Sequence, residues 1–150
     1  WERSKQVQHI RTWVGGRTIT HSKDDKVYLP AFYSRMRGEI EKLEASDFRR
    51  PDLQNLSVIE LYCQLYLDPR AHHHSVLQHD ISVLCADCYF VELACESVIV
   101  CGFPDDRGNY PGYEKYAGCM DGDTCSAKIS KDEFIATMRE AHSALSDVWI

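Results

Sequence analysis

The sequence lacks any long apolar segment. No run in it approaches the roughly 18–20 apolar residues that a membrane-spanning helix needs, so we expect no membrane span. It also lacks a basic N-terminal stretch followed by an apolar core, the pattern of a secretory signal peptide. The cellular compartment therefore stays open, and we prefer an intracellular protein over a secreted one.

Concentrated positive charge is missing as well. The net charge is −6, and "FRRP" at residues 48–51 contains the only pair of adjacent basic residues. Residues 1–50 carry 11 Lys and Arg against 7 Asp and Glu, whereas residues 51–150 carry 6 against 16. Nucleic-acid-binding proteins usually gather basic residues on one face. We therefore expect no nucleic-acid partner.

Internal repeats and low-complexity tracts are also absent, and the composition is that of a globular protein. Of the 150 residues 44% are apolar and 27% charged. A chain of this length can bury a real core without metal or disulfide support. We expect one compact domain spanning residues 1–150.

The N-terminal third predicts a β-hairpin followed by a helix. In "HIRTWVGGRTIT", residues 9–20, two short β-branched runs flank Gly15-Gly16, a pair typical of two-residue hairpin turns. The segment "KVYL", residues 26–29, is a possible third strand. Pro30 then opens a helical pattern. The apolar positions of that helix are Phe32, Met36, Ile40 and Leu43.

Two further helix starts carry capping boxes. Ser57 is followed three residues later by Glu60, and Ser130 by Glu133, the spacing at which side chains and backbone amides bond reciprocally. The first of these helices should end near Asp68, because a proline follows it. The last helix carries one apolar stripe, which we assign to the core. The stripe consists of Phe134, Met138, Ala141, Leu145 and Val148.

Residues 75–96 allow two interpretations. As one helix, they place Cys88 and Cys95 toward the core, where free cysteine often packs as a small apolar residue. Alternatively Asp87 caps a later helix with Cys88 in its first turn, as in thiol hydrolases, with His142 or another histidine as the base. Together with a strand in "SVIVCGF" and a loop over 102–128, this gives the predicted fold class. It is α+β and helix-rich, with an N-terminal hairpin, about four helices and one long loop containing Cys and Tyr.

The seven cysteines raise two other possibilities. Cys85 and Cys88 form a CxxC pair close to His74 and His79, which could complete a tetrahedral zinc site. No second CxxC supports it, so zinc is the one cofactor that we consider possible. Six of the cysteines lie between Cys85 and Cys125. In a secreted, effector-like protein these six could form three disulfides.

The loop at 104–123 is the least core-like part of the chain. Tyr110, Tyr113 and Tyr116 recur at three-residue spacing, with Asp105 and Asp106 nearby. Tyrosines in a polar loop are typical of recognition surfaces, although they could instead form a lid over the core. No convincing catalytic constellation is visible. We predict a non-catalytic protein-binding module, with the cysteine hydrolase and the disulfide-stabilised protein as alternatives.

Overall fold

A four-stranded antiparallel sheet forms the centre of the protein. The computed structural model describes residues 7–19, 26–78, 86–102 and 124–149. Within these residues, the strand order of the central sheet is β5-β6-β7-β9. The strands are β5 (Ser75–Val76), β6 (Asp87–Glu92), β7 (Ser97–Gly102) and β9 (Thr124–Lys128).

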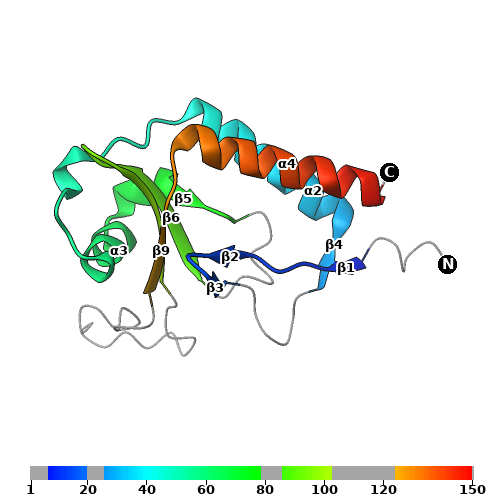
Figure 1. The fold of residues 1–150 in the computed structure, drawn as a ribbon, viewed down its shortest axis with the longest axis horizontal. Coiled ribbons are helices and arrows are strands. Elements are labelled where there is room, and N and C mark those ends of the chain that lie inside the picture. The colour runs from blue at the N-terminus through cyan, green and yellow to red at the C-terminus, as the bar shows by residue number, and fades with distance from the viewer. Residues whose placement is uncertain (1–6, 20–25, 79–85, 103–123, 150) are drawn as a thin grey trace.

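Helices cover both faces of this sheet (Figure 1). Helices α2 (Leu29–Ala45) and α4 (Lys131–Trp149) lie against each other on one face, and α3 (Val58–Leu67) lies on the other. Alternate strand residues point to opposite faces, so Phe90 packs in the cluster with α2 and α4 while Tyr89 and Val91 pack in the cluster with α3. Both faces of β6 and β7 are therefore buried.

The predicted N-terminal hairpin is confirmed. Strand β2 (Trp13–Val14) pairs with β3 (Arg17–Thr18) around Gly15 and Gly16, whose φ angles are 56° and 79°. Glycine adopts these left-handed values without steric cost. The hairpin turn also lies against β9, since a Cβ atom on Gly15 would collide with the carbonyl of Ser126. The possible third strand is confirmed too, as β4 (Lys26–Tyr28), which pairs with β1 (Val7–His9).

Both capping boxes are confirmed. The Ser57 amide donates to the Glu60 carboxylate at 2.8 Å, and the Glu60 amide donates to the Ser57 hydroxyl at 3.3 Å. The corresponding bonds between Ser130 and Glu133 are both 3.1 Å. Helix α3 ends at Leu67, as the following Asp-Pro pair predicts, and leads into a 3-10 helix, η2 (Pro69–His74). A second 3-10 helix, η1 (Pro51–Leu53), precedes α3.

The predicted helix over 75–96 is wrong, and so is the alternative helix beginning at Asp87. Asp87 begins strand β6, which pairs residue by residue with β7. Strands buried on both faces present continuous apolar runs, so hydrophobic periodicity alone does not separate them from a buried helix. Part of the predicted loop at 102–128 is also a strand, because Thr124–Lys128 forms β9. The α+β, helix-rich fold class itself is confirmed.

Candidate functional site

An apolar groove of about 660 Å³ opens among the described residues. It lies between α4 and residues 9–15, with α2 and the strands β7 and β9 contributing to its floor. We refer to it as the α4 groove. The residues lining it are His9, Ile10, Arg11, Thr12, Trp13, Val14, Gly15, Phe32, Met36, Leu77, Ile99, Ala127, Ile129, Phe134, Thr137, Met138, Ala141, Ala144, Leu145 and Val148.

Apolar side chains remain open to solvent along the rim of the α4 groove. Trp13 is 58% exposed on one side and Val148 is 61% exposed on the other. Single exposed apolar residues are ordinary, but apolar groups gathered around a groove mark interaction sites. Tryptophan is also among the residues that most often dominate protein interfaces. The α4 groove can therefore bind an apolar surface.

The basic residues of α4 have partners near α2, whereas two of its acidic residues have none among the described residues. Arg139 pairs with Glu44 of α2, and Lys131 donates to the carbonyl of Ser46 at 2.9 Å. The exposed acids Glu140 and Asp147 form no ion pair with any described residue. The two basic residues of α4 are thus engaged beside α2 or its C-terminal end.

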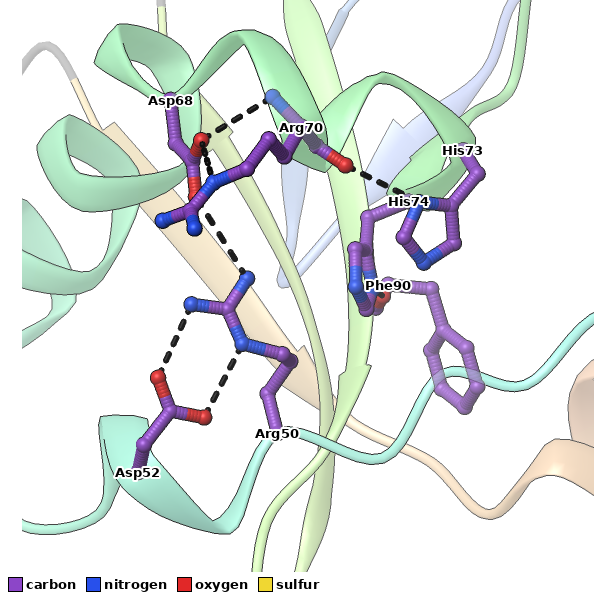
Figure 2. A network of polar contacts seen from close by, with 7 residues as sticks. All are labelled: Arg50, Asp52, Asp68, Arg70, His73, His74 and Phe90. Carbon is purple, nitrogen blue, oxygen red and sulfur yellow. Dashed lines mark hydrogen bonds and ion pairs between the residues drawn. The ribbon is translucent and has the colours of Figure 1, made fainter.

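A second polar cluster joins the ends of η1, α3 and η2 (Figure 2). Arg50 binds Asp52 through two hydrogen bonds of 2.9 Å and lies 3.8 Å from Asp68. Asp68 accepts from the backbone and side chain of Arg70. The hydrogen bonds with arginine lower the pKa of both carboxyl groups. Two arginines balance two aspartates, so we interpret this cluster as a clamp between chain segments.

His74 lies in the protein interior next to that clamp. Its side chain is fully buried, its Nδ1 atom is 2.9 Å from the carbonyl oxygen of Phe90, and its ring meets that of Phe48 edge-on. The Nε2 atom has no hydrogen-bond partner among the described residues. Burial disfavours the charged imidazolium and lowers the pKa of His74, although the Phe90 carbonyl partly opposes this shift.

We expect His74 to make the protein less stable in mild acid. Its pKa is below the ordinary value of 6.5, so below that pH the unfolded chain binds a proton that the folded chain does not. The free energy of unfolding should therefore fall as the pH drops from about 6.5 to 5, by at most about 1.4 kcal/mol per pH unit. Urea unfolding at several pH values measures this slope.

The matched variants are His74→Gln and His72→Gln, since His72 is exposed and, unlike His73, is not one of the groups that shift the pKa of His74. Only the first should flatten the slope between pH 5 and 6.5. Burial raises the pKa of Glu39 and of Asp87 and gives contributions of opposite sign. These contributions cancel when the variants are compared with the unmodified chain. Equal slopes in all three proteins would contradict the assignment to His74.

The predicted zinc ligands are only partly described. His79 and Cys85 lie outside the described residues. His74 has one ring nitrogen at the Phe90 carbonyl, and Cys88 is 1% exposed in β6. The described residues contain no group of three or more potential ligands placed to hold a metal ion. The four-residue zinc site remains a prediction.

Three cysteines form a row across the sheet. Cys88 of β6 is opposite Cys101 of β7, which is opposite Cys125 of β9. The hydrogen bond with Cys101 and burial raise the pKa of Cys125. For Cys101 the hydrogen bond with Cys125 lowers the pKa, but the one with Cys88 and burial outweigh it. Both thiols therefore remain protonated, which opposes nucleophilic chemistry.

The structure supports neither the cysteine hydrolase nor the three disulfides. The hydrolase alternative requires Cys88 in the first turn of a helix, but Cys88 is a buried strand residue. His142, its proposed base, stacks on Tyr33 between α4 and α2, with ring centroids 3.8 Å apart. Three disulfides among Cys85–Cys125 would use all six cysteines there. Four of the six are free thiols, namely Cys88, Cys95, Cys101 and Cys125.

The predicted contact surface lies outside the described residues. This holds for Tyr110, Tyr113, Tyr116, Asp105 and Asp106, so that surface remains a prediction. The α4 groove was not predicted from the sequence. The stripe containing Phe134 and Val148 was assigned wholly to the core, yet its C-terminal end lines an open groove. The sequence signal that could have indicated the groove is that the apolar stripe continues to the C-terminal end of the helix.

In the described residues the fold is thus an α+β layer structure, an antiparallel sheet with α2 and α4 on one face and α3 on the other. It is similar to the crystal structure of CdiI from Burkholderia dolosa AUO158, with a TM-score of 0.58 and 13% sequence identity. The match covers 87% of this chain and 78% of that one. No protein-family description and no curated protein matches the sequence. Among the described residues, no helix is both long and apolar enough to span a membrane.

Proposed function

We propose that this protein is a binding module of the immunity type, which binds a toxin protein and blocks its action. The observation that carries the proposal is the α4 groove, an open apolar surface with Trp13 and Val148 exposed at its rim. The shared fold with CdiI supports the choice of a toxin as partner. A role in binding requires no catalytic group in the groove.

The shape of the groove favours a macromolecule over a small substrate. Its lining on α4 runs from Phe134 to Val148, a distance of about 21 Å along a helix. A small-molecule site usually encloses most of its ligand and presents a few convergent polar groups. The α4 groove is instead open along α4, with Trp13 and Val148 exposed at its rim, which is the form of protein grooves that receive a secondary-structure element.

The test is to isolate the native complex and measure growth. The tagged protein is cross-linked in its own cells, the co-purifying protein is identified by mass spectrometry, and both are expressed together and separately. We expect a stable complex, and a partner that stops growth alone but not when this protein is present. A partner that leaves growth unaffected, or a protein that remains alone at every concentration, would refute the proposal.

A variant in the groove should weaken the complex. Trp13→Ala removes an exposed indole at the rim, and truncating an interface hot spot costs about 2 kcal/mol or more, about thirtyfold in Kd. The matched control is Tyr28→Ala, because Tyr28 is 52% exposed and does not line the groove. Calorimetry with the purified partner should show weaker binding for the first variant and unchanged binding for the second.

A further inference from the structure

We infer that the α4 groove binds an amphipathic helix of the partner whose polar flank is basic. This inference rests on the proposed function and adds the chemistry of the bound segment. It follows from three properties of the described residues: an apolar floor, an acidic flank on one side, and the engagement of the basic side chains of α4 elsewhere. The burial and the contacts of α4 residues support each of the three properties.

The floor of the groove accepts an apolar stripe. Phe134 and Met138 are buried beneath it, while Ala141, Ala144 and Val148 are exposed along α4. Small alanine side chains allow another helix to approach closely. The length from Phe134 to Val148, about 21 Å, accommodates roughly four turns of a partner helix.

Acidic side chains follow the edge of this floor. Glu140 lies three residues after Thr137 and four before Ala144, both of which line the groove. Asp147 lies three residues after Ala144. Residues at these spacings are neighbours on a helix surface. Both carboxylates are exposed, so they stand beside any helix seated in the groove.

The basic residues of α4 do not neutralise this flank. Arg139 is held by Glu44 of α2, and Lys131 lies over the ring of Phe48 at 5.5 Å. Glu140 and Asp147 form no ion pair with a described residue. Arg11 lines the opposite wall of the groove, among residues 9–15, so the negative charge belongs to the edge of α4 alone. Complementary charge favours a partner with Lys and Arg on the facing side and speeds its association.

The test uses two designed helical peptides of about 18 residues, long enough to span the groove. They share one Leu/Ala stripe and differ only in the flank, which carries lysines in one peptide and glutamates in the other. We expect the lysine peptide to bind about tenfold more tightly at low salt, about 1.4 kcal/mol, because it can form two exposed ion pairs, each of which contributes only modestly. The preference should shrink as salt is added.

Charge-reversal variants locate the binding site. Glu140→Lys with Asp147→Lys should reverse the peptide preference. The control, Glu41→Lys with Asp132→Lys, changes the net charge equally at exposed positions that are not three or four residues along a helix from a groove-lining residue, and should leave the preference unchanged. Circular dichroism checks that each variant is folded. Amide shifts at Trp13 and Ala144 should accompany binding of the lysine peptide.

Several outcomes would overturn the inference. One is equal binding of both peptides. Another is peptide binding that Glu140→Lys with Asp147→Lys leaves unchanged. A third is a dimer in sedimentation experiments that this double variant dissociates, because a second copy of the chain would then occupy the groove. The proposed function is judged separately. If a native toxin binds the Glu140/Asp147 variant and the Glu41/Asp132 control equally well, the inference of a basic partner helix is refuted but the proposed function is not. If the lysine peptide binds but no growth-inhibiting partner exists, the proposed function is refuted but the chemistry of the groove is not.

Discussion

Gly102→Ala should lower the free energy of unfolding by about 1–3 kcal/mol, the usual cost of overpacking a filled core. Gly102 ends β7 beneath α3, and a Cβ atom there would overlap three atoms of the Tyr62 ring. Tyr62 is 1% exposed and confined by the rings of Tyr66 and Tyr89, at 5.5 and 6.0 Å, so it has little room to move. Thermal unfolding should show a decrease of about 2–4 °C for each kcal/mol.

Two companion variants isolate the steric cause. Gly38→Ala lies in α2 with no atom near the added Cβ, and there alanine should stabilise the helix by about 0.5–1 kcal/mol. In a Tyr62→Leu background the Gly102→Ala substitution should cost less, because the ring atoms that it meets are absent. A double-mutant cycle without coupling would contradict the collision, since residues in contact usually couple by at least about 0.5 kcal/mol.

Phe90→Ala should have the largest effect on stability, about 3–5 kcal/mol, as for other buried aromatic truncations. The side chain is fully buried in β6, and its ring lies 5.2 Å from that of Phe48 and 5.5 Å from that of Phe134. It therefore joins the sheet to α4 and to the segment before α3. Removing the ring leaves a cavity between β6, α4 and the segment before α3. These elements cannot all move inward to fill it.

Chemical denaturation of Phe90→Ala, Phe90→Leu and Val58→Ala measures this effect. Leucine keeps most of the volume and should cost about 1–2 kcal/mol, less than alanine because the cavity is smaller. Val58 is 39% exposed at the start of α3, so its substitution should stay within about 0.5 kcal/mol. If Phe90→Ala resembled Val58→Ala, the packing described for β6 would be wrong.

The cysteine-rich segment shows where reasoning from sequence failed. Residues around Cys88 suit a buried helix and a buried strand equally, because apolar residues occur at nearly every position. Residues 87–92 form a strand because residues 97–102 pair with them and because helices cover both faces of the sheet. The pairing of β7 with β6 and with β9 places Cys101 between Cys88 and Cys125, a proximity that the spacings of 13 and 24 residues do not reveal.

The sequence by itself determined the features that depend on neighbours in the chain. The glycine turn of the first hairpin, the starts of α3 and α4, and the end of α3 all follow from residues within one turn of each other, because capping and turn formation are local. Only the tertiary structure decided that Cys63, Cys88 and Cys101 are core residues while Cys95 is exposed, and that the end of the α4 stripe lines an open groove. Both depend on which distant segments come together, since burial is a property of the packed layers and not of the helix or strand alone.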